Sequence, residues 1–251
     1  MRFVWTISWV LIAWELVSRF VLPEIDPMMA ILIPAPTVWL STAGSFILSG
    51  QLPYHIFQSL KRVLLAWSIT ALVAIPLGIA MAWWHWLNKH LEPAIELIRP
   101  IPPIAWIPLS ILWFGIGDFQ NEFIIAIGAF FPILLNTIHG VTELDGIYIK
   151  AGQSLGANQW RIFRKIIIWG ALPSIFTGLR IGLGAAWMCL VAAELVGATS
   201  GLGFMIQDAR NFLRTDIVVL GMIVIGVLGI LLDRGLIYLR NAIMPWHMRF
   251  S

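Results

Sequence analysis

Six long apolar runs constrain this chain more than any other feature of its sequence. Each is long enough, or nearly so, to cross about 30 Å of hydrocarbon as a helix that rises about 1.5 Å per residue. The runs lie near residues 3–22, 63–84, 95–114, 123–139, 174–196 and 217–239. Lipid offers no hydrogen-bond partner to an exposed backbone, so each run must satisfy its own amides and carbonyls as a helix. The sequence therefore predicts one all-α polytopic membrane domain over residues 1–251, with about six transmembrane helices.

The scarcity of charge supports lipid as the solvent of this chain. Hydrophobic residues make up 59% of the sequence and charged residues only 12%, which is too little charge to cover a soluble domain of this size. The basic residues behind the net charge of +3 cluster between the apolar runs. That distribution is typical of membrane topology rather than of nucleic-acid binding, so we expect the lipid bilayer and no nucleic acid as partner.

The sequence lacks motifs that would indicate catalysis. It has no GxxxxGK[ST] loop for ATP and no HExxH pair for zinc. Cys189 is the only cysteine, and the five histidines are scattered without a metal-ligand spacing. We therefore expect a protein that is not itself an enzyme and that holds neither a cofactor nor a metal.

Prolines interrupt the third apolar run. Pro100, Pro102, Pro103 and Pro108 each remove a backbone donor and clash with the preceding helical turn. The pattern predicts a broken or kinked helix over residues 95–114.

The basic residues between the runs predict the orientation, because they are enriched in cytoplasmic segments. With the N-terminus inside, eleven basic residues lie in the cytoplasm: Arg2, Lys89, Arg99, Lys150, Arg161, Arg164, Lys165, Arg180, Arg234, Arg240 and Arg249. Five lie outside: Arg19, Lys61, Arg62, Arg210 and Arg214. The excess predicts cytoplasmic N- and C-termini.

One basic amphipathic segment, Lys150–Pro173, separates the fourth and fifth runs. Its apolar residues recur at helical spacing opposite its basic ones, which is typical of a surface helix rather than a span. Gly156 favours a sharp turn and Asn158 favours a helix N-cap, so two short helices are predicted. On periodicity alone, a basic helix lying on anionic lipid explains the segment equally well.

At Gly156 the segment resembles a known motif. SLGANQWRIFRKIIIWGALP is similar to the EAA loop with which permeases of binding-protein-dependent ABC importers contact their ATPase. Gly156 matches the glycine of that loop and Ile166 its isoleucine, whereas Lys150 replaces the acidic residue and Trp169 stands where the first proline is expected. Leu172 and Pro173 supply the LP pair four residues later.

The resemblance implies a fold and a set of contacts. The fold is the type I ABC importer permease fold, with a coupling loop over about residues 141–172. The residues expected to dock the ATPase are Lys150, Ala151, Gly152, Ser154, Leu155, Gly156, Ala157, Asn158 and Arg161. The implied partners are ABC ATPase subunits at the cytoplasmic face, a substrate-binding protein at the outer face and a second permease copy in a homodimer. The implied location is the bacterial cytoplasmic (inner) membrane.

Two further stretches point to one branch of these permeases. PIPPIAWIPLSILWFGIGD and AAELVGATSGLGFMIQDARNFLRTD resemble segments of the permeases for nitrate, bicarbonate, sulfonates and taurine, in the same order along the chain. The resemblance implies ATP-driven import of a small anion, with nitrate, nitrite or bicarbonate favoured and a sulfonate or taurine as the alternative. An energy-independent channel or carrier is the remaining rival, and it would not need a docking loop.

Two ionisable residues are candidates for the translocation pathway. Glu194 lies near the end of the fifth run, where a charge costs free energy and is commonly retained for a function. Its alternative role is a structural carboxylate that bonds the backbone of the following GATSGLG loop. Arg99 could face an anionic solute, or it could extend to the headgroups as basic residues at span ends often do.

Small residues recur every four positions in the fifth run, at Gly178, Gly182 and Ala186. Residues of this size at this spacing let two helices approach closely. We therefore expect close packing there, either within the subunit or across a dimer interface.

Overall fold

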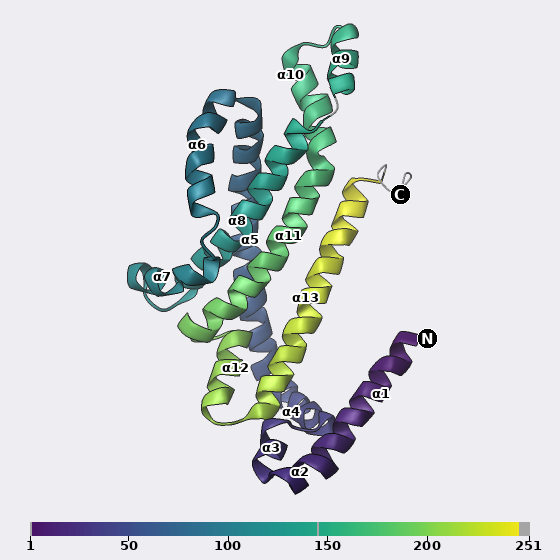
Figure 1. The fold of residues 1–251 in the computed structure, drawn as a ribbon, viewed down its shortest axis with the longest axis vertical. Coiled ribbons are helices and arrows are strands. Elements are labelled where there is room, and N and C mark those ends of the chain that lie inside the picture. Colours follow the sequence, from purple (N-terminus) through teal and green to yellow (C-terminus); the bar gives the residue numbers. More distant parts are fainter. Residues whose placement is uncertain (1, 145, 246–251) are drawn as a thin grey trace. The chain divides into compact units, whose positions relative to one another are not determined.

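A computed structural model describes residues 2–144 and 146–245, and every regular element in these ranges is a helix (Figure 1). The all-α prediction is confirmed. The chain forms two compact units, and each is described separately below. Unit 1 contains residues 1–61 and 194–228, and unit 2 contains residues 62–193 and 229–251. Arg249, which was counted in the orientation argument, lies outside the described residues.

Unit 1 consists mainly of short helices. They are α1 (Arg2–Leu16), the π-helical turn η1 (Val17–Val21), α2 (Leu22–Ile25), α3 (Pro27–Leu32), α4 (Pro36–Leu48) and α12 (Leu202–Asn211), with the first parts of α5 (Gln51–Trp83) and α13 (Thr215–Ile243) and the end of α11 (Ile168–Gly197). The carboxylate of Asp26 caps α3 by accepting from the Met28 amide at 2.9 Å. Glu15 and Arg19 form an ion pair four residues apart at 2.5 Å, and both also bond the Thr37 hydroxyl.

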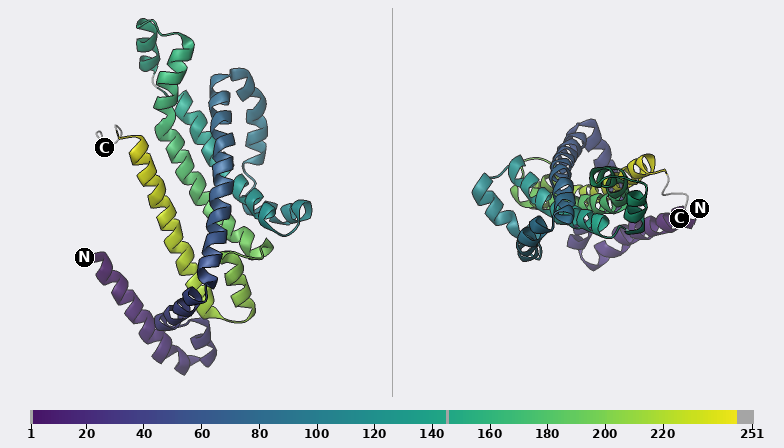
Figure 2. Two further views of the ribbon diagram at one scale, coloured as in Figure 1. Left: turned by 180° about the vertical axis from the view of Figure 1, so that it is seen from behind. Right: turned by 90° about the horizontal axis from the view of Figure 1, so that it is seen from above.

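Unit 2 contains the longer helices. It holds the remainder of α5, α11 and α13 together with α6 (His85–Ile98), the 3-10 turn η2 (Pro103–Trp106), α7 (Ile107–Phe114), α8 (Asp118–Thr142), α9 (Gly146–Ser154), α10 (Gln159–Ile162) and the π-helical turn η3 (Phe163–Ile167). Within this unit, α5, α8 and α11 run side by side (Figures 1 and 2).

Glycines allow these three helices to approach closely. A Cβ added to Gly178 would lie 2.7 Å from Asn136 Cβ, and one added to Gly182 would lie 2.7 Å from Ile133 Cγ1. Gly78 brings α5 equally close to Thr137 of α8. The small-residue spacing of the fifth run therefore serves packing of α11 against α8 within the chain.

Four helices in the described ranges are long and apolar enough to cross a membrane. They are Gln51–Trp83, Asp118–Thr142, Gln159–Gly197 and Thr215–Ile243. A fifth results if the bent pair of helices around the proline cluster is one span. Residues 3–22, the first of the six predicted spans, are not in this set. They are helical and form α1, η1 and the start of α2.

The proline cluster breaks the chain as predicted. α6 ends at Ile98, helical structure resumes at Pro103, and the two helices meet at 82°. Pro102 and Pro103 occupy the positions just before and at the start of η2, where a missing amide hydrogen leaves no bond broken.

The basic segment differs from its prediction in one respect. A short helix does begin after Gly156, but it is not a separate surface helix, because residues 159–197 form one helix of 39 residues. The helix that contains the fifth apolar run therefore starts at Gln159 rather than near Ser174. Pro173 lies inside this helix, and the π-helical turn Phe163–Ile167 precedes it without interrupting it.

Candidate functional site

The elbow, residues 146–167, consists of α9, a turn, α10 and η3 (Figure 2). α9 ends in a pair of backbone bonds: the Gly156 amide donates to the Gln153 carbonyl at 2.9 Å, and the Ala157 amide donates to the Gly152 carbonyl at 3.0 Å. This is the Schellman arrangement, which requires a left-handed residue just past the helix. Gly156 supplies it with a φ of +75°. The predicted turn at Gly156 is confirmed.

Asn158 starts the next helix. Its backbone is extended, and its side-chain oxygen accepts from the Arg161 amide at 2.9 Å. This bond satisfies one of the amides that the first helical turn leaves without a partner. The predicted N-cap is confirmed, so both ends of the turn are fixed by local bonds.

The predicted docking residues divide by exposure. Lys150, Ala151, Ser154, Leu155, Gly156, Asn158 and Arg161 are exposed, Ala157 is half-buried and Gly152 is buried. Leu155 is 87% exposed, so a large apolar side chain lies on the surface of the elbow. The elbow therefore presents one mixed polar and apolar surface around Gly156.

Gly152 has a packing role. A Cβ at this position would lie 2.7 Å from Ile166 Cδ1 and 3.4 Å from Ile162 Cγ1. Only glycine lets α9 lie this close to α10 and η3. Ile162 is buried and Ile166 half-buried beneath α9, so Ile162 does not form part of the surface open to a partner protein.

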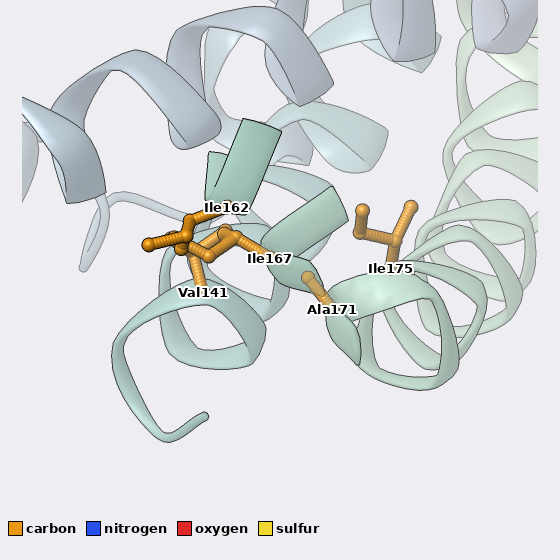
Figure 3. Close-up of a cluster of buried hydrophobic side chains, with 5 residues drawn as sticks. All are labelled: Val141, Ile162, Ile167, Ala171 and Ile175. Carbon is orange, nitrogen blue, oxygen red and sulfur yellow. The ribbon is translucent and has the colours of Figure 1, made fainter. Parts of the chain in front are cut away.

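A buried apolar cluster joins the elbow to the long helices (Figure 3). It comprises Val141 of α8, Ile162 and Ile167 of the elbow, and Ala171 and Ile175 of α11. Because these side chains are at most 9% exposed, the elbow is packed onto the ends of α8 and α11 rather than linked by loose chain.

The aromatic residues of the elbow pack on α5. Phe163 stacks with Trp160 at a ring distance of 5.6 Å and meets Trp83 edge-on at 4.9 Å. These contacts lie beside an apolar cavity of about 770 Å³ between α5 and the elbow. They add a second attachment between the elbow and the long helices.

Glu194 is buried in unit 1, with 1% of its surface exposed. Its carboxylate accepts from the Ser59 hydroxyl at 2.9 Å and from the Gly203 amide at 2.9 Å, at the N-terminus of α12. A carboxylate is favourable there because the first amides of a helix carry partial positive charge. Glu194 therefore accepts from the loop backbone, as its alternative structural role predicts, and a pathway role for it stays a prediction.

The same loop uses its other amides within the chain. The Gly201 amide donates to His55 Nδ1 at 3.1 Å, and the Leu202 amide donates to Ser59 Oγ at 2.8 Å. Three consecutive amides thus have side-chain acceptors. Ser59 was not identified from the sequence, because nothing near it in the chain indicates a partner 135 residues away.

Arg99 forms the C-cap of α6 and is exposed, with its amide donating to the Ile95 carbonyl at 2.8 Å. A basic residue at a helix C-terminus is stabilised by the helix dipole. Arg99 and Glu194 lie in different units, and a pathway role for Arg99 stays a prediction.

Arginine–aspartate pairs form further charged sites, and two of them involve α13 or the turn before it. Arg214, in the turn between α12 and α13, bonds Asp216 through Nε at 3.0 Å and Nη2 at 2.7 Å, and this bonding raises the pKa of the Arg214 guanidinium. Arg180 of α11 bonds Asp233 of α13 in the same way. Sequence reasoning missed the second pair, although a basic and an acidic residue within two apolar runs were a usable signal.

Comparison with known proteins decides the family. The model of binding-protein-dependent transport system inner membrane components matches residues 74–243. The chain belongs to this family. An ABC transporter permease protein of Methanocaldococcus jannaschii is 42% identical over 96% of this chain and 88% of its own length. The taurine transport permease TauC of Escherichia coli K12 is 41% identical over 96% and 86%. The bicarbonate transport permease CmpB of Synechocystis is 34% identical over 94% and 85%.

A solved structure agrees on the fold. A chain of the MetNI methionine ABC transporter, in an inward-facing conformation, superposes with a TM-score of 0.56 at 20% identity, covering 72% of this chain and 93% of that chain. The type I ABC importer permease fold is thereby confirmed. The family consists of inner membrane components of binding-protein-dependent transport systems, and this chain is a multi-pass membrane permease of that family.

Proposed function

We propose that this permease is the membrane subunit of an ATP-driven importer for a small oxyanion, and that its elbow receives the movement of a partner ATPase. The observation that carries the proposal is the exposed turn at Gly156, which is fixed by its own bonds and packed onto α8 and α11 through a buried cluster. Import proceeds by alternating access, with a binding protein at the outer face, cytoplasmic termini and two permease copies in each transporter.

The build of the elbow suits the transmission of force. A moving ATPase must push on a rigid and partly polar surface that is firmly joined to the spans. The exposed side chains of Lys150, Leu155 and Arg161 offer that surface, and the cluster around Ile162 and Ile167 supplies the joint. An amphipathic helix that enters a groove of a partner is a common mode of recognition. Lys150 stands where the motif has an acidic residue, so the contact at that position is expected to involve an acidic group of the ATPase.

The names of the relatives support a small oxyanion as the solute. TauC is named for taurine, a sulfonate, and CmpB for bicarbonate, and both align over nearly the whole chain. Each solute carries a small oxyanion group. The proposal therefore includes a sulfonate such as taurine and an inorganic anion such as bicarbonate, nitrate or nitrite.

The coupling role can be tested at Gly156. A Gly156→Leu variant forces a branched residue into a left-handed backbone and disturbs the turn that the ATPase contacts. We expect a purified complex of permease and ATPase to lose solute-stimulated ATP hydrolysis and uptake by at least tenfold, while the permease still unfolds cooperatively at a similar temperature.

Gly50 provides a matched control. It has the same φ of +75°, and a Cβ there would also meet nothing within 4 Å, but it lies between α4 and α5. Gly50→Leu imposes equal backbone strain and should leave coupling intact. Equal coupling in the two variants, or a tagged permease that never co-purifies with an ATPase, would count against the proposed function.

The solute can be identified by uptake into vesicles that contain the whole transporter and its binding protein. Taurine, bicarbonate and nitrate are added separately, and ATP is supplied on the side of the vesicle membrane that corresponds to the cytoplasm. ATP-dependent accumulation of one of them supports the importer, whereas equilibration that continues without ATP would favour an energy-independent carrier.

A further inference from the structure

The long helices α11 and α13 carry opposite charges that meet within unit 2. Arg180 Nε donates to Asp233 Oδ1 at 2.6 Å, and Arg180 Nη2 donates to Asp233 Oδ2 at 2.9 Å. Both residues lie in helices that are long and apolar enough to span the membrane. Their side chains are nevertheless 51% and 39% exposed in this chain. Charges in such helices normally face protein or a water-filled cavity rather than lipid, so this face of the unit is expected to be hydrated or covered.

The guanidinium of Arg180 has hydrogen-bond donors that Asp233 does not use. A guanidinium has five N–H donors, and Asp233 uses one on Nε and one on Nη2. The two donors of Nη1 and the second donor of Nη2 have no acceptor among the described residues. Leaving such donors without a partner away from bulk water is costly, which favours an additional acceptor at this position.

A cavity of about 310 Å³ adjoins the pair, and a second arginine lines it. Arg240 follows Asp233 by seven residues, which places it about two helical turns further along the same face of α13. It bonds the side-chain oxygen of Asn241 at 3.0 and 3.2 Å and meets no carboxylate in the part of the chain that the structure describes. The cavity is therefore lined by two guanidinium groups and one carboxylate.

We propose that the α11–α13 cavity binds a small oxyanion, the translocated solute, through Arg180 and Arg240. This inference rests on the proposed function for the identity of the ligand. A carboxylate, a sulfonate and bicarbonate each present two oxygens that can accept a guanidinium edge in the bidentate manner. The solute binds the open donors of Arg180, or it displaces Asp233 from Nε and Nη2. Arg240 offers the next positive charge along α13.

Asp233 then acts as the internal counter-ion of the empty site. It neutralises Arg180 when no solute is present, and its negative charge opposes the binding of an anion to the same guanidinium. Removing its charge should therefore strengthen anion binding, whereas removing the charge of Arg180 should weaken it. If the ion pair had a purely structural role, removing either charge would lower the stability of the permease. Neither change would then alter anion binding.

The test measures anion affinity in the full-length permease, purified with its ATPase partner in lipid nanodiscs. The probes are taurine and bicarbonate, with dihexanoyl phosphatidylglycerol as the lipid-headgroup probe. We expect Arg180→Gln to weaken binding of the preferred small anion about tenfold or more and Arg240→Gln to weaken it several-fold. Asp233→Asn should tighten it several-fold. Arg214→Gln, which breaks an arginine–aspartate pair outside this cavity, should leave it unchanged.

Folding of the variants is monitored separately. If Arg180→Gln does not assemble, Arg180→Lys keeps the charge but loses the bidentate edge, and an intermediate loss of affinity supports the proposal. Unchanged affinity in Arg180→Lys together with unchanged affinity in Asp233→Asn would overturn it. Binding of phosphatidylglycerol alone, with neither small anion bound, would also overturn it in favour of a lipid-headgroup site.

Uptake measurements separate this inference from the proposed function. If the wild-type transporter imports taurine or bicarbonate and Arg180→Gln changes neither uptake nor affinity, the cavity site is wrong and the importer proposal stands. If the wild type imports neither anion but binds one of them through Arg180, the anion site stands and the proposed solute is wrong.

Discussion

Gly156 and Gly201 both lie in turns between helices and both have positive φ, but their surroundings are opposite. A Cβ at Gly156, where φ is +75°, would meet no atom within 4 Å. A Cβ at Gly201, where φ is +111°, would lie 2.2 Å from Oε1 of Glu194. The backbone requires glycine at both positions. Only at Gly201 does the space around the residue also require it.

The difference shows two ways of fixing a turn. The α11–α12 turn is held by side chains from elsewhere in unit 1, since His55, Ser59 and Glu194 accept its three consecutive amides. Among the described residues, the hydrogen bonds that hold the elbow turn come from its own backbone and from Asn158, and its outer surface stays open. The first arrangement suits a rigid joint, and the second suits a surface that another protein contacts.

The largest effect is expected from Gly201→Ala. The new Cβ must displace the buried Glu194 carboxylate, and the residue must also hold a strained backbone. We expect the free energy of unfolding of the purified permease in detergent to fall by about 3 kcal/mol or more, measured by thermal or denaturant unfolding.

Gly184→Ala is the control for that measurement. Gly184 lies in the interior of α11, and a Cβ there meets no atom within 4 Å. Alanine should be neutral or stabilising at this site, by up to about 1 kcal/mol. A loss below about 1 kcal/mol for Gly201→Ala would show that the turn is not clamped by Glu194.

A smaller loss is expected from Glu194→Gln. The neutral amide keeps an oxygen for the Gly203 amide but weakens the charge-assisted bonds of the carboxylate, at a cost of about 2 kcal/mol. Denaturant unfolding of Glu194→Gln, Ser59→Ala and the double variant forms a cycle that isolates the pair. A coupling energy of about 1 kcal/mol is expected, and strict additivity would contradict a direct bond between the two residues.

The elbow could be predicted in detail because its determinants are local. Gly156 and Asn158 fix the turn through bonds to residues at most five positions away, and these are visible in a short stretch of sequence. The same local reasoning gave the wrong extent for the helix that follows. The glycines and basic residues of the segment suggested a break before Ser174, whereas the buried cluster around Ile167 and Ala171 keeps the helix continuous.

The long-range contacts were not predicted from the sequence. The partner of Glu194 lies 135 residues earlier, and the partner of Arg180 lies 53 residues later. The fold class followed from hydropathy, because lipid leaves few alternatives to helices. Of the six predicted spans, four correspond to long apolar helices of the described residues, and a fifth corresponds to the bent pair of helices around the proline cluster.

The elbow turn can be destabilised without affecting the α11–α12 turn. Asn158→Ala removes the side-chain acceptor for the Arg161 amide and should destabilise the first turn of α10 by about 1 kcal/mol. Hydrogen exchange should then show about fivefold lower protection at the α10 amides, with no change at α12. Asn158→Ser keeps a capping oxygen and should restore protection. Equal protection in all three proteins would show that the cap contributes nothing to the elbow.

The smallest effect concerns a third left-handed turn, which has neither glycine nor a clamp. α12 ends in the same pair of bonds as α9, with the Leu213 amide on the Arg210 carbonyl at 3.1 Å and the Arg214 amide on the Ala209 carbonyl at 2.9 Å. Leu213 therefore occupies the position that Gly156 fills in the elbow, with a φ of 55°. A leucine in this conformation carries strain of about 1 kcal/mol, and its side chain is 65% exposed.

Asparagine tolerates the left-handed conformation better than leucine does, so Leu213→Asn should stabilise the permease by about 0.5 kcal/mol, or about 1–2 °C in unfolding temperature. Leu213→Ala removes the same side chain but keeps the strain, and it should give no such gain. If leucine is retained for a contact at the outer face, Leu213→Asn and Leu213→Ala should both reduce uptake driven by the binding protein, although only the former raises stability. Equal unfolding temperatures for the two variants would mean that the strain at Leu213 is relieved by its surroundings. Leu213 and Gly156 would then share the same backbone geometry but not the same energetic preference for a residue that tolerates it.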